Sequence, residues 1–155
     1  MSTNETARGD GETIRVGAED VVVRAAGADT GGALLAVEVT MPPGGGPPGL
    51  HRHPSAELYR VDRGELAIYR EDGGAVRRIA APAGAVVPIP GGAAHTVRNE
   101  SDADAHAHVV FAPGGEMEAF MRAAATATGP AEVMALAARH GVELLQPGAS
   151  PSRTA

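Results

Sequence analysis

Two segments of the chain carry histidine, glutamate, glycine and proline at fixed separations, and together they restrict the fold to strands around a shared site. They are Gly45-x5-His51-x-His53-x3-Glu57-x6-Gly64 and Gly84-x5-Pro90-x-Gly92-x2-His95-x3-Asn99. Because a β-strand repeats every two residues, an unbroken strand would project His51, His53 and Glu57 from one face. His95 must then come from a second strand. The intervening glycines and prolines supply the backbone angles that tight turns need.

Short runs rich in β-branched residues recur between turn residues along most of the chain. They cover residues 14–16, 21–24, 33–40, 58–61, 65–70, 76–79, 86–89, 95–98 and 105–111. Evenly spaced strands of this length predict an all-β sandwich or barrel.

The apolar pattern changes to a helical one after Pro113. The residues Met117, Phe120, Met121 and Ala124 would share one face of a helix. A second helix is expected to begin near Pro130 and to end at Gly141, since proline suits the first turn and glycine the left-handed C-cap. We expect both helices to pack on the outside of the barrel or on a partner subunit.

The length of 155 residues predicts one domain. Residues 1–12 and 146–155 are polar and are expected to be disordered tails, which leaves residues 13–145 as the folded unit. The N-terminus has no apolar run typical of a signal peptide, and no stretch approaches the length of a membrane span. We therefore expect a cytoplasmic protein with no membrane partner.

Composition excludes several function classes. The formal charge is −6 with no basic run and only four aromatic residues, which argues against a nucleic-acid partner. The chain has no cysteine, so thiolate metal sites and thiol nucleophiles are impossible. All 13 basic residues are arginines, which excludes Schiff-base chemistry and a P-loop lysine.

Every fixed position of the two segments resembles the paired motifs of the cupin superfamily. The resemblance implies a single antiparallel jelly-roll β-barrel, here with C-terminal helices. It also implies one divalent transition metal held inside by His51, His53, Glu57 and His95.

Imidazole and carboxylate ligands suit borderline cations such as iron, manganese, cobalt, nickel, copper or zinc. Four protein ligands leave one or two positions on the ion for water, dioxygen or a substrate oxygen. The chain also resembles quercetin-dioxygenase-like cupins in the pattern Pro-Pro-Gly-x2-Pro-Pro before the ligand strand and in its C-terminal helices. That resemblance favours iron, manganese or nickel.

Several other side chains are weaker candidates. Tyr59 has the parity of Glu57 and could donate a proton to a bound substrate or anchor a carboxylate, or it could be a core aromatic residue. Glu38 could be a general base or a solvent-facing residue. His106 and His108 repeat the His-x-His spacing, but Ala107 and Val109 between and beyond them favour the opposite face as the core.

The remaining polar candidates have structural explanations. Arg52, Arg60 and Arg98 have the parity of an outer face, His140 suits the C-terminal end of a helix, and Asn99 suits a turn.

The resemblance implies a metal-dependent dioxygenase that acts on a small enolisable or phenolic substrate, with Glu57 and Tyr59 as catalytic candidates. With so few aromatic residues, a substrate smaller than a flavonol is expected. Two alternatives stay open. One is a non-redox metal-dependent isomerase, cyclase or lyase, and the other is a non-catalytic module that binds a small molecule. A homodimer through an edge strand within residues 14–24 is expected.

Overall fold

The computed structural model describes residues 2–7 and 9–145. The tail expected at 146–155 lies outside the described residues, as do two positions of the tail expected at 1–12. The first strand, β1, begins at Glu12, while residues 2–7 and 9–11 lie outside helices and strands.

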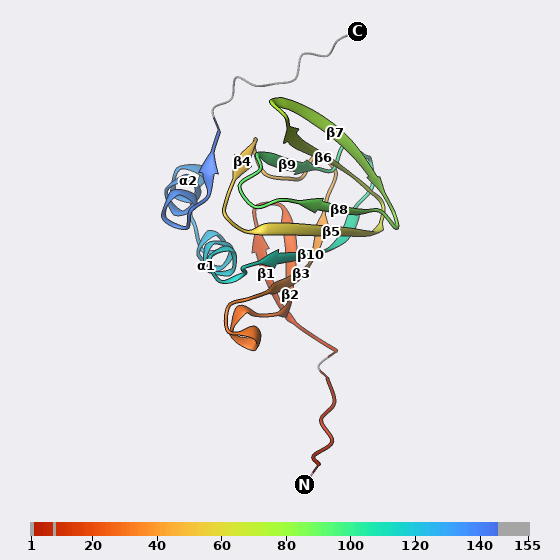
Figure 1. Cartoon of the computed structure of the whole chain (residues 1–155), viewed down its shortest axis with the longest axis vertical. Coiled ribbons are helices and arrows are strands. Elements are labelled where there is room, and N and C mark those ends of the chain that lie inside the picture. Colours follow the sequence, from red (N-terminus) through yellow and green to blue (C-terminus); the bar gives the residue numbers. More distant parts are fainter. Residues whose placement is uncertain (1, 8, 146–155) are drawn as a thin grey trace.

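The strands form two antiparallel sheets that face each other, as a jelly roll requires (Figure 1). The six-stranded sheet has the order β1 (Glu12–Val16), β2 (Glu19–Ala25), β3 (Leu35–Met41), β10 (Ala105–Ala112), β5 (Ala56–Arg63) and β8 (Val86–Ile89). The five-stranded sheet has the order β11 (Glu143–Leu144), β4 (His51–Arg52), β9 (His95–Arg98), β6 (Glu65–Asp72) and β7 (Ala75–Pro82). The predicted jelly-roll fold is confirmed, although the described strands remain two sheets and do not close into one barrel.

The space between the sheets holds the apolar core. Strand β10 shows why, because its inward residues Ala105, Ala107, Val109 and Phe111 are all buried, while the residues between them are more exposed. Leu35 and Val37 on the neighbouring strand β3 are almost completely buried as well. This alternation follows from the two-residue repeat of a strand that has one face on the core.

Two helices follow the last long strand, as predicted. Helix α1 (Gly115–Ala124) and helix α2 (Pro130–Arg139) lie side by side at one end of the sheets (Figure 1). Met117 and Ala137 turn inward and join the core cluster. A short 3-10 helix, η1 (Gly27–Thr30), was not predicted. No described helix is long and apolar enough to cross a bilayer.

The first motif does not lie on one unbroken strand, so the condition under which His51, His53 and Glu57 would share one strand face is not met. Strand β4 ends at Arg52 and β5 begins only at Ala56, with Pro54 between them. Proline has no backbone N–H to donate to a ladder, so the strand cannot continue through it. The chain uses this interruption to leave the five-stranded sheet and enter the six-stranded one.

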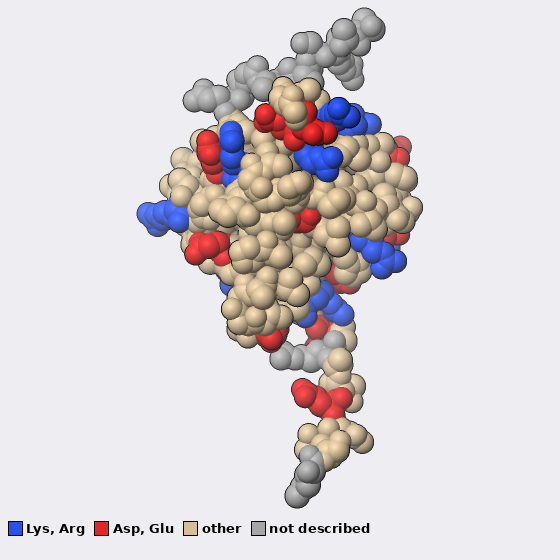
Figure 2. All heavy atoms as spheres, in the orientation of Figure 1, with Lys and Arg blue, Asp and Glu red and all other residues tan. Residues whose placement is uncertain are grey.

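Surface charge is mixed in sign. Figure 2 shows acidic and basic side chains interspersed around the margin of the face in view, with uncharged surface between them.

Candidate metal centre

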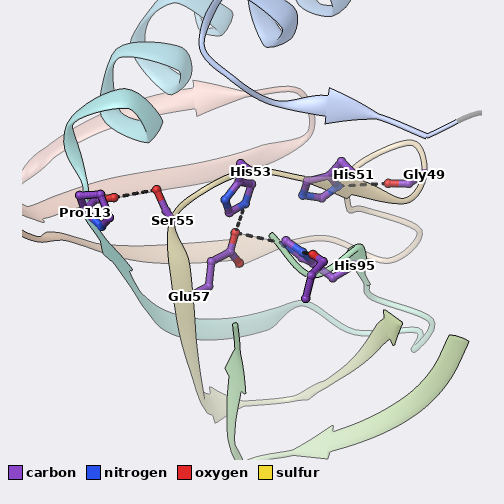
Figure 3. A network of polar contacts seen from close by, with 8 residues as sticks. Gly49, His51, His53, Ser55, Glu57, His95 and Pro113 are labelled. Carbon is purple, nitrogen blue, oxygen red and sulfur yellow. Dashed lines mark hydrogen bonds and ion pairs between the residues drawn. The ribbon is translucent and has the colours of Figure 1, made fainter. Parts of the chain in front are cut away.

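Four side chains converge where the first motif crosses between the sheets (Figure 3). His51 lies on β4, His53 in the link after it, Glu57 on β5 and His95 on β9. One ligand atom from each lies within 4.8 Å of all the others. The exposed fractions are 9% for His51, 3% for His53, 5% for Glu57 and 1% for His95. The structure thus brings together all four residues that the sequence motifs singled out.

Glu57 is the hub of this cluster. Its Oε1 lies 2.6 Å from His53 Nε2 and 3.2 Å from His95 Nε2. His51 pairs directly with His95 across the β4–β9 ladder, and their ring centroids are 4.4 Å apart. The three imidazole rings therefore face one carboxylate inside the protein.

Backbone carbonyl groups fix two of the three rings. His51 Nδ1 lies 3.2 Å from the Gly49 carbonyl oxygen, and His95 Nδ1 lies 2.8 Å from the Ala93 carbonyl oxygen. Because a carbonyl only accepts, both Nδ1 atoms carry the proton and donate it. The Nε2 atoms of His51 and His95 are then the nitrogens that face the cluster. Sequence reasoning missed these acceptors, since a backbone carbonyl leaves no side-chain signal.

The pKa values follow from burial and mutual contact. Burial, with help from His95, lowers the pKa of His51 from 6.5 to about 4. Burial alone would raise the pKa of Glu57, but the hydrogen bonds from His53 and His95 outweigh it and lower the pKa to about 2. Burial acts to lower the pKa of His95, yet the hydrogen bond and charge of Glu57 raise it above 6.5. His51 is therefore neutral and Glu57 ionised at neutral pH.

The donor set fits a divalent transition metal. Glu57 Oε2 is buried and has no hydrogen-bond partner among the described residues. A buried carboxylate oxygen without a partner is costly, and a cation at the centre of the cluster would provide one. Three imidazole nitrogens and one carboxylate are a donor set that borderline metals accept. The buried His-His-Glu-His group could therefore bind one such metal.

Tyr59 lies two residues after Glu57 on β5 and is half-buried against the core cluster. Burial and the adjacent Glu57 raise the pKa of its hydroxyl well above 10.0. The hydroxyl therefore keeps its proton at every pH at which the protein would work, and it lies close enough to Glu57 to be affected by its charge.

The second His-x-His pair lies on the opposite face of β10, away from the cluster. His108 Nε2 is 2.7 Å from Glu38 Oε1, and its Nδ1 contacts Asp62. His106 Nδ1 is 3.3 Å from the same Asp62 carboxylate. The pairing of Glu38 with His108 could not be foreseen without the register of β3 and β10, which sets these two residues opposite each other.

The remaining candidates lie outside the four-residue cluster and make structural contacts or face solvent. Arg52 and Arg60 are exposed, and Arg98 donates to the Pro47 carbonyl at 3.1 Å. Asn99 is 1% exposed, and its Nδ2 donates to the Met41 and Ala103 carbonyls at 2.8 Å each. His140 Nδ1 lies 3.2 Å from Glu116 Oε2.

Comparison with known proteins gives one family and many structural relatives. The Cupin domain family model matches residues 37–111. No curated protein sequence matches the chain. A recombinant oxalate oxidase in complex with glycolate is 25% identical, with a TM-score of 0.53, over 63% of this chain and 52% of that one.

Two further solved structures share the fold at lower identity. A formate complex of oxalate decarboxylase from Lactobacillus farciminis is 24% identical, with a TM-score of 0.56, over 66% of this chain and 31% of that one. The polyketide cyclase RemF from Streptomyces resistomycificus is 18% identical, with a TM-score of 0.57, over 72% of this chain and 80% of that one. The chain spans about half of the oxalate oxidase and about a third of the decarboxylase. These relatives include an oxidase, a decarboxylase and a cyclase, so the shared fold does not fix one activity.

Proposed function

Residues 37–111 of this chain form a cupin domain, which makes it a member of the cupin superfamily, and from that premise we propose that it is a metal-dependent oxidoreductase. The proposed reaction is the dioxygen-dependent oxidation of a small enolisable or phenolic substrate. The ligands are His51, His53, Glu57 and His95, and the metal is iron, manganese or nickel, with zinc, cobalt and copper compatible with the same donors.

The observation that carries this proposal is the complete, buried cluster of four ligand atoms within 4.8 Å of one another. A metal held by these four residues would supply a Lewis acid beside the substrate, with coordination positions left over for a substrate oxygen. The likeness to oxalate oxidase supports an oxidoreductase.

The protein's own groups would orient and protonate the substrate. The Gly49 and Ala93 carbonyls hold His51 and His95 in one tautomer and one ring orientation. The low pKa of Glu57 suits a ligand more than a strong base, because it keeps the carboxylate ionised. Tyr59, whose raised pKa keeps its hydroxyl protonated, is the better candidate to donate a hydrogen bond to the substrate.

The donor chemistry also supports a second candidate. Nitrogen and oxygen ligands without a thiolate bind zinc as well as iron. A zinc-loaded site would polarise a carbonyl and stabilise an enolate, which is the chemistry of a non-redox isomerase, cyclase or lyase.

The first test is elemental analysis of protein purified without an affinity tag or added metal. We expect close to one metal per chain, and its loss in His51→Ala, His53→Ala, Glu57→Ala and His95→Ala. The matched control is His108→Ala, which removes an imidazole from the outer face of the six-stranded sheet and should leave the metal content unchanged. Normal metal in His53→Ala would overturn the ligand set.

The identity of the metal then decides between the two candidates. Iron, manganese or nickel together with oxygen uptake on an enolisable test substrate would support the oxidoreductase. Zinc together with proton exchange under nitrogen would support the second candidate instead.

A further inference from the structure

The three histidines of the metal cluster are not held in place to the same degree. His51 and His95 lie on strands and pair with each other in the ladder of β4 and β9. Backbone carbonyl groups also fix their rings through Nδ1. His53 lies in the link between β4 and β5, and its Nδ1 has no hydrogen-bond partner among the described residues. The place of His53 therefore depends on what holds this link.

The loop of the second motif holds the first end of the link. The His53 carbonyl accepts a hydrogen bond from the Gly92 N–H at 2.8 Å. Gly91 packs so closely on the link that a Cβ there would lie 2.2 Å from the Pro54 carbonyl oxygen. Pro54 itself has no N–H to donate, so the other end of the link needs an anchor of its own.

Ser55 provides that anchor. It is 5% exposed, and its Oγ donates to the Pro113 carbonyl at 2.7 Å (Figure 3). The register of β10 on β5 pairs Ala112 with Ala56, so Ser55 follows as the residue opposite Pro113. Proline cannot donate a ladder hydrogen bond at this position. The serine hydroxyl therefore extends the contact between the two segments by one hydrogen bond.

The acceptor of this hydrogen bond is itself firmly held. Pro113 lies between the last residue of β10 and Gly114, the N-cap of α1. The Gly114 N–H donates to the Gly32 carbonyl at 3.1 Å, and a Cβ at Gly114 would lie 2.3 Å from Leu35 N. Leu35 belongs to β3 and is 0% exposed. Ser55 thus ties the link to the packed part of the six-stranded sheet.

The other three clustered residues do not depend on the link in this way. Glu57 lies within β5 and pairs with Phe111 on one side and Ile89 on the other. A displacement of the link would therefore move His53 relative to the rest of the cluster. The 2.6 Å contact between His53 Nε2 and Glu57 Oε1 would change first.

We propose that Ser55 is a positioning residue of the metal centre, which holds His53 in place through its hydrogen bond to the Pro113 carbonyl. The inference rests on the proposed metal site. It adds to that site a residue that acts through His53 and touches neither the ion nor the substrate.

The test measures zinc affinity, by competition with a chromophoric chelator, in two matched pairs. Wild type and Ser55→Ala differ by the hydroxyl, and so do Ser55→Thr and Ser55→Val, whose side chains are similar in size. Ser55 lines a pocket of about 450 Å³, so the larger side chains have room. In each pair the member without the hydroxyl should bind zinc about tenfold more weakly, because a group that orients a metal ligand is lost. The second pair decides the matter if Ser55→Ala does not fold.

A second readout separates positioning from a general loosening of the structure. In zinc-loaded protein labelled with ¹⁵N at histidine, removal of the hydroxyl should shift the ring signals of His53 and leave those of His51 and His95 in place. Shifts of equal size at all three histidines would overturn the inference. Equal zinc affinity within both pairs would overturn it as well.

The matched control is Ser101→Ala, which removes a hydroxyl that donates to the Ala103 carbonyl at 3.0 Å in the loop between β9 and β10. This variant should keep the zinc affinity of the wild type, and a loss equal to that of Ser55→Ala would contradict a role specific to Ser55. Wild-type protein that binds no zinc would instead overturn the proposed metal site, so the two failures are distinguishable.

Discussion

His51 and His95 face each other as direct partners in the antiparallel pair of β4 and β9, with ring centroids 4.4 Å apart. Two imidazoles at this separation cannot both be charged without repulsion, and the pair shows opposite shifts. The pKa of His51 falls to about 4, whereas Glu57 raises that of His95 above 6.5. His95 therefore binds a proton more tightly than His51 does.

Metal uptake should therefore release a proton. A metal binds only the neutral imidazole, so the proton on His95 must leave, while His51 and Glu57 already have the form that binds. Affinity should accordingly fall as the pH drops through the raised pKa of His95, which lies above 6.5. Calorimetric titration of metal-free protein at pH 6.5, in buffers with different ionisation enthalpies, measures the release. Zero protons released would contradict the assignment.

Tyr59→Phe should separate chemistry from metal binding. The hydroxyl lies near Glu57 and keeps its proton, but it is not one of the four clustered ligands. We expect unchanged metal content and a fall in kcat of about 100-fold, the usual range for removal of a general acid. Steady-state kinetics with elemental analysis of the same sample make the comparison. Loss of metal in this variant would assign Tyr59 to support of the site.

Gly46→Ala should destabilise the fold. Gly46 has φ +124, and a Cβ there would overlap the Val97 carbonyl oxygen on the strand that carries His95. The control is Gly44→Ala, where φ is +76 but no atom lies within 4 Å of the added Cβ. Both variants place a Cβ at a positive φ, but of the two only Gly46→Ala also meets backbone atoms, so it should lose about 2 kcal/mol more free energy of unfolding. Urea denaturation of both proteins measures it.

The proposed homodimer has a structural candidate in β1, which is one of the two edge strands of the six-stranded sheet in the described residues. Thr13→Pro and Ile14→Pro remove successive N–H groups, and these point to opposite sides of a strand. One of the two should abolish dimerisation while leaving the stability of the monomer intact, because its N–H points away from β2. Sedimentation velocity with thermal unfolding distinguishes them. A wild-type protein that sediments as a monomer at high concentration would contradict the dimer.

Much of the architecture follows from periodicity. The runs of Val, Ile and Ala with a two-residue repeat predicted strands such as β10, and the change of period after Pro113 predicted α1. The sequence argument placed His51, His53 and Glu57 on one face only for an unbroken strand, and the break at Pro54 removes that condition. The proline that forbids one was in the sequence all along.

What could not be predicted depends on contacts between distant segments. Strand β11 is two residues long and is defined by its pairing with β4, so no local pattern marks it. Asp62 meets His106 and His108 because of the register of β5 on β10. The burial of the four clustered residues likewise required the two facing sheets.

The break at Pro54 also has a mechanical consequence. His51 and His95 belong to the five-stranded sheet and Glu57 to the six-stranded one. An ion bound by all three residues would therefore crosslink the two sheets. Separation of the layers would then expel the ion, and the binding free energy would be added to the cohesion between them. The metal-loaded protein would open as a single cooperative unit, in which neither sheet melts ahead of the other.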